Sequence, residues 1–224
     1  MFIFNLKAYR EASGEKGLAL AKLAKRWSNL LKVDAVIAPG QADLSFLNHF
    51  LSQGEFFHFF AQHADVVHAG QFTGSVSLEG IKKMGCSGVL LNHAEKKITR
   101  RKIAELVEGS AFYGLKSVVC AKDGRQAADL ARLNPWAVAV EIPELIGTGV
   151  SISQAKPEVF VKALEKIREK NASSKVFAGA GVASGEDVVK ARELGAEGIV
   201  LSSRFVFAQD HSKKLQELLG GWKA

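Results

Sequence analysis

The segment KVFAGAGVASGEDVVKARELGAEGIVLSS, residues 175–203, contains the unit from which the fold can be predicted. Two apolar runs, KVFAG (175–179) and GIVLS (198–202), flank a predicted helix over residues 184–194. The apolar residues of both runs are continuous instead of alternating, which is typical of strands buried on both faces of a parallel sheet. The segment therefore predicts a strand–helix–strand unit.

The same arrangement extends along the chain. Continuous apolar runs predict six more strands: FIFN (2–5), AVIA (35–38), FHFFA (57–61), GVLLN (88–92), SVVCA (117–121) and WAVAV (136–140). Helical patterns lie between Leu20 and Leu31 and over residues 99–108, 124–133, 156–169 and 212–219. Eight strands in 224 residues leave about 28 residues for each unit, which is short but sufficient for a (β/α)8 barrel. We predict this barrel as one domain over residues 1–224; a doubly wound open sheet is the alternative, because periodicity does not show whether a sheet closes.

Composition indicates a soluble globular chain, with 47% hydrophobic and 24% charged residues and no apolar run of the roughly 18 to 20 residues that a membrane span needs. Cys86 and Cys120 are not spaced as a CxxC pair and no secretory signal is visible, so we expect a reduced, cytoplasmic setting. The net charge of +7 is spread over many predicted helices. It indicates a solvated basic surface or a field that collects a small anion, ahead of nucleic-acid binding.

Polar residues follow five of the predicted strands. The carboxyl ends of the strands of such a barrel share one mouth, where conspicuous polar residues are typical of a catalytic site. Together they supply an amine, an imidazole, two carboxylates and two loops of small residues, so the chemistry does not require a metal. These residues are Asn5, Lys7, Asn92, His93, Glu95, Glu141, Gly179, Gly181, Ser202 and Ser203.

Glu141 is the strongest candidate for a general base. It follows the apolar run WAVAV and begins the segment EIPELIGTG, residues 141–149. A carboxylate among Val140, Ile142 and Leu145 would be poorly hydrated, and desolvation makes a carboxylate a better base.

Two other patterns weigh against a cofactor or a metal. The segment GAGVASG (179–185) does not match the dinucleotide-binding GxGxxG, because Ser184 takes the place of the third glycine; a loop whose N–H groups face an anion fits better. His58, His63 and His68 are spaced by five, which is not the repeat of one helix face, and no Cys or carboxylate completes a familiar set of metal ligands. We predict no metal site and no cofactor, and place His63 in the loop after the third strand.

Several motifs, in chain order, resemble those of the triosephosphate isomerase family, most of all its short archaeal type. They are N-L-K-A-Y (5–9), F-F-A-Q-H (59–63), G-Q-F-T-G-S-V-S (70–77), L-N-H-A-E (91–95), V-V-C (118–120), V-E-I-P-E-L-I-G-T-G (140–149), G-A-G-V (179–182) and G-I-V-L-S-S (198–203). The resemblance implies a TIM barrel. It also implies interconversion of dihydroxyacetone phosphate and D-glyceraldehyde 3-phosphate through an enediolate, in glycolysis and gluconeogenesis.

The resemblance also assigns roles. Glu141 matches the family's general base, His93 the electrophile, and Lys7 the cation near the substrate oxygen and phosphate. Asn5 matches a substrate contact and Glu95 the carboxylate that orients the catalytic groups. Residues 142–149 match a loop that closes over the substrate. The expected phosphate grip consists of backbone N–H groups near Ile146, Gly147, Gly181, Ser202 and Ser203.

The chain departs from the family pattern at three positions. It matches the family in the loop that contacts a neighbouring subunit. Ala94 stands where a serine is usual, Ile142 where a proline is usual, and Arg204 where archaeal members tend to have glycine. Residues 70–77 match the loop that reaches a neighbouring subunit, with Thr73 at the position that approaches the neighbour's active site. The resemblance therefore implies a homo-oligomer, a dimer or a tetramer.

Two other functions compete with this one. A different barrel enzyme acting on a sugar phosphate would keep the phosphate loops and use another set of acids and bases. A catalytically silent barrel that binds another protein or nucleic acid is suggested only by the net charge of +7.

Overall fold

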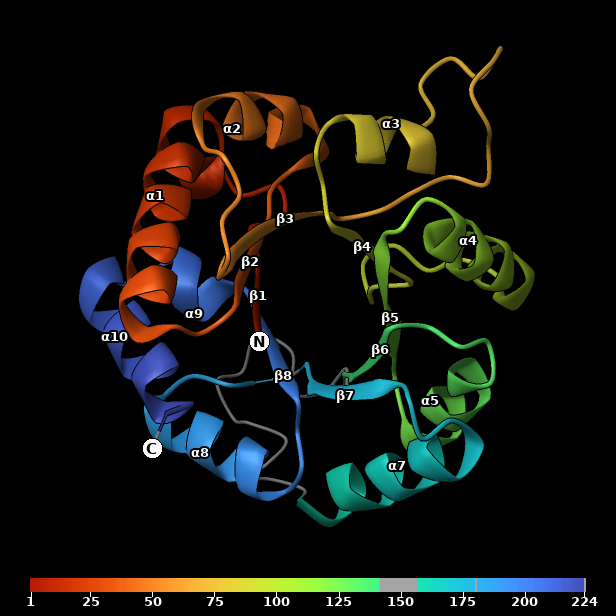
Figure 1. Cartoon of the computed structure of the whole chain (residues 1–224). Coiled ribbons are helices and arrows are strands. Elements are labelled where there is room, and N and C mark those ends of the chain that lie inside the picture. The colour runs from red at the N-terminus through yellow and green to blue at the C-terminus, as the bar shows by residue number, and fades with distance from the viewer. Residues whose placement is uncertain (142–156, 180, 224) are drawn as a thin grey trace.

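The computed structural model describes residues 1–141, 157–179 and 181–223, and its strands form a closed barrel surrounded by helices (Figure 1). All strand pairs are parallel and join neighbours in chain order, and Phe2 of the first strand pairs with Ile199 of the last to close the barrel. This confirms the predicted (β/α)8 barrel, and the open-sheet alternative is wrong. The strands are β1 (Phe2–Asn5), β2 (Ala35–Ala38), β3 (Phe57–Ala61), β4 (Gly88–Leu91), β5 (Lys116–Ala121), β6 (Ala137–Val140), β7 (Lys175–Ala178) and β8 (Gly198–Leu201).

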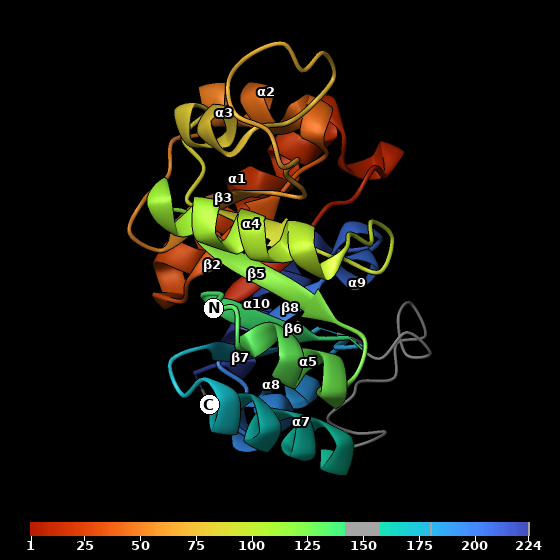
Figure 2. The same cartoon turned by 90° about the vertical axis from the view of Figure 1, so that its right-hand side faces the viewer.

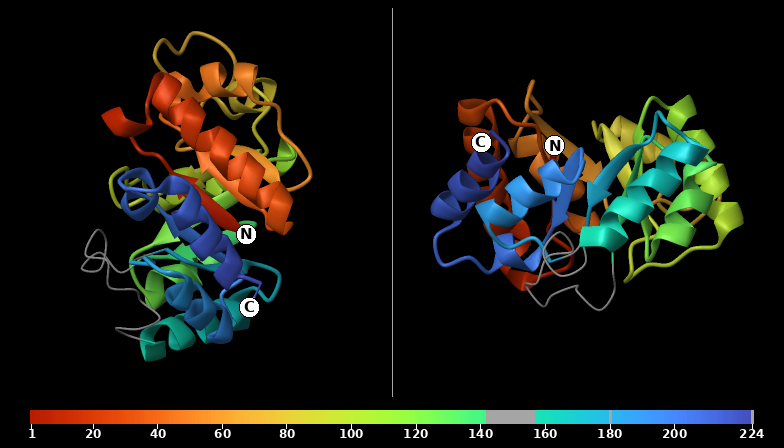
Figure 3. Two further views of the ribbon diagram at one scale, coloured as in Figure 1. Left: turned by 90° about the vertical axis from the view of Figure 1, so that its left-hand side faces the viewer. Right: turned by 90° about the horizontal axis from the view of Figure 1, so that it is seen from below.

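The predicted strands agree with the observed ones to within one residue at each end. The helices form an outer ring, in which α10 packs between α1 and α8 (Figure 3). Sequence periodicity missed the shortest helices, because a helix of four to seven residues contains too few turns to show a repeat. The helices are η1 (Arg10–Ala12), α1 (Gly14–Leu31), η2 (Gln41–Asp43), α2 (Leu44–Phe50), α3 (Leu78–Lys83), α4 (Arg100–Phe112), α5 (Gly124–Ala131), α7 (Pro157–Lys170), α8 (Gly185–Glu193), α9 (Ser203–Val206) and α10 (His211–Gly221).

The strands are apolar on both faces because each face packs against a different core. In β1, Phe2 and Phe4 join the large core between strands and helices, whereas Ile3 joins the smaller core inside the barrel. Alternate residues of a strand point to opposite faces, so a continuous apolar run supplies both cores. The core inside the barrel consists of Ile3, Val36, Ala38, Phe60, Leu90, Val118, Cys120, Ala137, Ala139, Phe177 and Val200.

Two glycines make room for the large rings of the inner core. A Cβ atom at Gly88 would lie 2.5 Å from the ring of Phe60, and one at Gly198 would lie 2.6 Å from the ring of Phe177. Both distances are shorter than any ordinary carbon–carbon contact. The barrel interior is therefore a packed core and not a pore, as is usual for this architecture.

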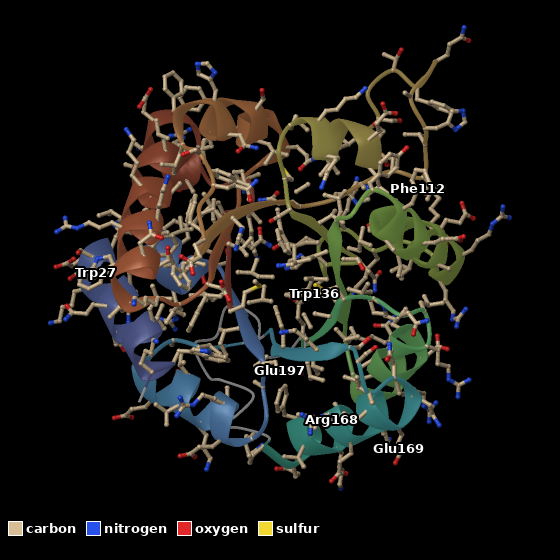
Figure 4. The ribbon with its side chains drawn as sticks, in the orientation of Figure 1. Trp27, Phe112, Trp136, Arg168, Glu169 and Glu197 are labelled. Atoms are coloured by element: carbon tan, nitrogen blue, oxygen red, sulfur yellow. The ribbon has the colours of Figure 1, made fainter. Side chains whose placement is uncertain are left out.

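Trp136 lies at the amino ends of the strands, inside the ring of strands in Figure 4. Its ring contacts Phe177 edge to face, with the centroids 5.6 Å apart. The ammonium groups of Lys116 and Lys175 lie 5.1 and 5.5 Å from the Trp136 ring, within range of a cation–π interaction. Aromatic packing and these lysines fill this end of the barrel, so the functional site must be sought at the carboxyl ends.

The loop between β3 and α3 extends away from the rest of the molecule (Figures 1 and 2). Two hydrogen bonds between Asp65 and Val76 join the two ends of this loop. The Asp65 carboxylate accepts from the Val76 N–H at 2.9 Å, and the Asp65 N–H donates to the Val76 carbonyl at 2.8 Å.

Among the described residues, no helix combines the length and apolar character needed to cross a bilayer.

Candidate active site

A pocket opens at the carboxyl ends of the strands and collects most of the residues that the sequence singled out. Its walls come from the segments that follow β1, β4, β6, β7 and β8, so residues far apart in the chain meet there. The sequence analysis gave no role in this pocket to Tyr9, and left the effect of Arg204 open. The lining residues are Asn5, Lys7, Tyr9, His93, Glu141, Gly179, Gly181, Val182, Val200, Leu201, Ser202, Ser203 and Arg204.

Glu141 is a buried carboxylic acid that faces this pocket. Its backbone N–H donates to the carbonyl of Ala121 at 2.8 Å, which continues the pairing of β6 with β5 and fixes where the side chain begins. The residue is 3% exposed, and burial raises its pKa to about 7. A Cβ atom at position 179 would lie 2.6 Å from Cγ of Glu141, so Gly179 on the next strand leaves the space that the carboxyl group occupies. The burial expected from the sequence is confirmed.

Cys120 lies inside the barrel beside Glu141, in a role that the sequence analysis missed. Burial, together with the neighbouring Glu141, raises the pKa of the thiol well above its ordinary value. The thiol therefore stays protonated and interacts with the Glu141 carboxyl group, which lowers the pKa of Glu141 against the effect of burial, as do Lys97, Lys7 and the Ala94 backbone N–H. The contact between Cys120 and Glu141 could be predicted only once β5 and β6 are known to be neighbours.

His93 faces Glu141 as a neutral imidazole. Burial lowers the pKa of His93; Glu95 raises it, and Lys7 and Lys97 lower it further. The backbone N–H of Glu95 donates to Nδ1 of His93 at 3.2 Å, so Nδ1 is the acceptor and the ring proton of the neutral form is on Nε2. Nε2 lies 3.7 Å from Oε1 of Glu141, which is too long for a hydrogen bond. The ring nitrogen that carries the proton is therefore the one nearer Glu141, in a pocket that both residues line.

Lys7 has a left-handed backbone, with φ of 51°, which is uncommon for a residue other than glycine. Two amides support this conformation: the Lys7 N–H donates to Oδ1 of Asn5 at 3.0 Å, and Nε2 of Gln62 donates to the Lys7 carbonyl at 3.0 Å. Asn5 is itself buried at the end of β1. No role was expected for Gln62, although it lies within the quoted motif F-F-A-Q-H. Its contact depends on the turn at Lys7, which a strand pattern does not reveal.

Glu95 pairs with Lys7 and borders His93. Nζ of Lys7 donates to Oε1 of Glu95 at 2.5 Å, and Oε2 of Glu95 lies 3.8 Å from Nδ1 of His93. The Lys7 side chain is only 13% exposed, so the ion pair holds the ammonium group at the pocket wall. The orienting role that the resemblance implies for Glu95 stays a prediction.

Small residues after β7 and β8 form the rest of the pocket wall. Gly181 has φ of 74°, a conformation that favours glycine, and Ser184 starts α8 with a capping box that includes Asp187. Ser203 is the first residue of α9, and the first N–H groups of a helix have no carbonyl acceptor within that helix. The hydroxyl oxygen of Ser202 is buried without a hydrogen-bond partner in the described part of the chain.

The remaining predicted residues lie elsewhere or outside the described residues. Thr73 is exposed in the loop between β3 and α3, away from the pocket. Ile146, Gly147 and the whole predicted closing loop, residues 142–149, lie outside the described residues. His58 lies 3.9 Å from Asp34, and His63 lies 3.2 Å from Asp65 after β3, as expected from the sequence.

A comparison with known proteins assigns the chain to a family. The model of the family described as "Triosephosphate isomerase" matches residues 1–218. The chain belongs to the triosephosphate isomerase family. It is 40% identical over 219 residues to the triosephosphate isomerase of Methanothermus fervidus, covering 98% of this chain and 97% of that protein. It is 41% identical over 218 residues to that of Pyrobaculum calidifontis (97% and 94% covered) and 36% identical over 219 residues to that of Methanocaldococcus jannaschii (98% of each).

This membership confirms the resemblance stated from the motifs, including its archaeal character, since these three relatives are archaeal proteins. The pocket also contains groups suited to a reaction of a phosphorylated substrate. A buried carboxyl group, a neutral imidazole and a lysine line one pocket, beside loops of small residues whose N–H groups suit an anion.

Proposed function

We propose that this pocket interconverts dihydroxyacetone phosphate and D-glyceraldehyde 3-phosphate, with Glu141 as general base, His93 as electrophile and Lys7 as the stabilising cation. The chain is a triosephosphate isomerase by family, and the site residues are our assignment. The supporting observation is Glu141 itself. Its Oε2 is buried without a hydrogen-bond partner in the described part of the chain, at a pocket wall. Such groups are rare in folded proteins unless a ligand completes them.

The reaction requires removal of a proton from a carbon next to a carbonyl group. In the proposed step, the ionised Glu141 takes the proton from C1 of dihydroxyacetone phosphate, and the electron pair moves to the carbonyl oxygen to give an enediolate. Nε2–H of His93 and the ammonium group of Lys7 stabilise that oxygen as its charge develops. His93 then gives its Nε2 proton to the oxygen on C2 and takes the proton of the C1 hydroxyl group, so the negative charge moves to the C1 oxygen. Return of the proton from Glu141 to C2 then leaves the C1 carbonyl and the C2 hydroxyl of D-glyceraldehyde 3-phosphate, so one carboxyl group serves as base and then as acid.

We assign the phosphate group to the wall that contains Gly181, Ser202 and Ser203. The start of α9 at Ser203 supports this assignment, because Ser203 lines the pocket and the first N–H groups of a helix have no carbonyl acceptor within that helix. Gly181 lines the same pocket in a left-handed conformation. The proposed contribution of Ile146 and Gly147 concerns residues outside those described.

A coupled assay tests the function directly. Purified protein supplied with D-glyceraldehyde 3-phosphate is expected to form dihydroxyacetone phosphate, which glycerol-3-phosphate dehydrogenase then reduces with consumption of NADH. A panel of pentose and hexose phosphates distinguishes this activity from that of another sugar-phosphate enzyme. Turnover of a different sugar phosphate would favour another sugar-phosphate enzyme. Absence of turnover, together with tight, salt-sensitive binding to nucleic acid, would favour a catalytically silent binding protein.

The pH profile of kcat/KM is expected to report the ionisation of Glu141. The pKa of Glu141 is about 7 in the free protein, so the catalytically active carboxylate is lost as the pH falls through 7. The logarithm of kcat/KM should therefore level off above pH 7 and fall with unit slope below it. The substrate phosphate takes up its own proton near pH 6, by analogy with phosphorylated side chains, and this should increase the slope to two. A profile that stays level down to about pH 6, and then falls with unit slope as far as the ordinary Glu141 pKa of 4.5, would show that the carboxyl group is hydrated.

We further propose that the protein is a cytoplasmic homo-oligomer. The loop before α3 supports the oligomer, because it extends from the barrel with Phe72 42% exposed and Thr73 exposed beside it. The free thiols of Cys86 and Cys120 fit a reducing compartment. Light scattering at assay concentrations measures the oligomeric state, and a fully active monomer would contradict the oligomer.

A further inference from the structure

Tyr9 is an aromatic residue of the pocket wall that has no part in the proposed mechanism. It lines the pocket together with Lys7, His93 and Glu141. Its backbone is held by the turn that follows β1, because the Tyr9 carbonyl accepts a hydrogen bond from the N–H of Ala12 at 3.0 Å. Its side chain is half-buried and packs against the core between the strands and the helices. The ring of Tyr9 is therefore a fixed part of the wall.

The ring of Tyr9 lies beside the ammonium group of Lys7. Nζ of Lys7 is 5.9 Å from the centroid of this ring, within range of a cation–π interaction. The same Nζ also contacts Oε1 of Glu95 at 2.5 Å. One ion pair leaves the flexible stem of a lysine several ways to reach its partner, and a second contact removes some of them. The carboxylate and the ring together restrict where the ammonium group can lie.

Phe207 supports Tyr9 from the segment that follows α9. The two rings meet edge to face, with their centroids 4.8 Å apart and their planes at 64°. The N–H of Phe207 donates to the Ser203 carbonyl at 2.9 Å, which holds Phe207 to the end of α9. The helix itself is anchored by Phe205, which is fully buried with its ring 4.7 Å from that of Phe4 in β1. Tyr9 thus contacts both the catalytic lysine and a segment fixed to the barrel.

We propose that Tyr9 is a positioning residue whose ring holds the Lys7 ammonium group where negative charge develops on the substrate oxygen. This inference rests on the proposed function. A charge stabilises a transition state most when it is already in place, because it then needs no reorganisation during the reaction. Glu95 alone holds the ammonium group by a partly exposed carboxylate. The ring adds a contact that does not neutralise the charge of Lys7.

The kinetic test compares Tyr9→Leu and Tyr9→Phe with Tyr113→Leu, a matched control. Tyr113 is the other tyrosine of the chain; it is also half-buried against the same core, and it does not line the pocket. Tyr9→Leu keeps an apolar side chain without a ring, so kcat/KM should fall about 5- to 30-fold, the value of a cation–π contact at a largely buried site. Tyr9→Phe keeps the ring and should stay within about twofold of the unmodified protein, as should Tyr113→Leu.

A double-mutant cycle shows whether Tyr9 acts through Lys7. Introduced into Lys7→Met, Tyr9→Leu should change kcat/KM by less than about twofold, because the ammonium group that the ring holds is already gone. An equal loss with and without Lys7 would mean that Tyr9 acts independently and would overturn the inference. A loss in Tyr9→Phe as large as that in Tyr9→Leu would assign the effect to the hydroxyl group and would overturn it too.

NMR spectroscopy of protein with ¹³C-labelled lysine tests the positioning without any turnover. The ε-methylene signal of Lys7 is identified by its absence in Lys7→Met. In the unmodified protein and in Tyr9→Phe, the ring current should move the ε protons upfield, and relaxation of the ε carbon should report a restrained group. In Tyr9→Leu both signatures should disappear, while unchanged signals from the other lysines show that the variant is folded.

These results separate the inference from the proposed function. A mobile Lys7 in the unmodified protein, or a Lys7 equally restrained in Tyr9→Leu, overturns the inference whether or not the protein is an active isomerase. Absence of triose phosphate isomerisation by the unmodified protein overturns the proposed function, and the NMR comparison still shows whether Tyr9 holds Lys7.

Discussion

A Glu141→Gln variant is expected to lose about three to four orders of magnitude in kcat, the contribution of a well-placed general base. Glutamine is nearly isosteric with glutamic acid, so the variant keeps the packing against Gly179 and Cys120. It cannot accept the substrate proton at any pH, because an amide is not ionised. Steady-state kinetics in the coupled assay measures the loss, and KM should change far less than kcat.

The same variant is expected to be more stable than the unmodified protein at pH 8. The pKa of Glu141 rises from an ordinary value of 4.5 to about 7 on folding, because burial disfavours the charged carboxylate. Between these values the folded state holds more protons than the unfolded state, so stability falls as the pH rises, and the full penalty is present above 7. This penalty is of the order of 3 kcal/mol at most, and the uncharged amide of the variant would not carry it. Urea unfolding at pH 8 and pH 5 measures the difference, which should shrink at pH 5.

A matched control tests whether the loss of kcat and the gain in stability at pH 8 are specific to the buried carboxyl group of Glu141. Glu169 is an exposed carboxylate on the outer face of α7 (Figure 4), so Glu169→Gln removes the same charge without touching the pocket. It should alter neither kcat nor the pH dependence of stability. If Glu141→Gln retains more than a tenth of the activity, Glu141 is not the base, and if it is markedly less stable at pH 8, the carboxylate is structural.

The barrel could be predicted from the sequence because its strands are buried on both faces. In β1, Phe2 and Phe4 belong to the outer core and Ile3 belongs to the inner core. All three residues are therefore apolar, and the strand is visible in the sequence as an unbroken apolar run. Parallel strands also place their carboxyl ends at one mouth, so Asn5, Glu141 and other polar residues after the strands could be expected to share a site. Closure itself was not visible, because the pairing of β8 with β1 depends on twist and stagger and not on hydrophobicity.

The partners within the site could not be predicted in the same way. The tautomer of His93 depends on one backbone N–H, that of Glu95, whose direction is set by the turn after β4. Asn92 in that turn has φ of 59°, and neither the apolar pattern nor the motif reveals a left-handed asparagine. The closeness of Cys120 to Glu141 depends on the register of β5 against β6, in which Cys120 pairs with Ala139. Local sequence predicts which side chains reach the mouth; the turns and the register decide what each contacts.

A Lys7→Met variant is expected to lower kcat/KM by about 10²- to 10³-fold, as loss of one preorganised group that stabilises a developing oxyanion does. Methionine keeps most of the length and apolar volume of lysine and removes only the charge. Glu95 then loses the cation that its Oε1 contacts at 2.5 Å, so the carboxylate is less firmly held beside His93. The loss should appear in both kcat and KM, because the ammonium group faces the ground state and the transition state.

A Lys7→Gly variant separates the cation from the backbone that carries it. Lys7 adopts φ of 51°, a left-handed conformation that costs a residue with a Cβ atom about 1 kcal/mol and costs glycine almost nothing. Lys7→Gly should therefore be at least as inactive as Lys7→Met, yet unfold at a higher urea concentration than Lys7→Met does. Equal stability of the two variants would show that Asn5 and Gln62 already compensate the strain, and activity within tenfold of the unmodified protein in Lys7→Met would remove Lys7 from the mechanism. The expected pair of results would mean that the chain tolerates an unfavourable backbone conformation at Lys7 in order to direct its ammonium group at the substrate.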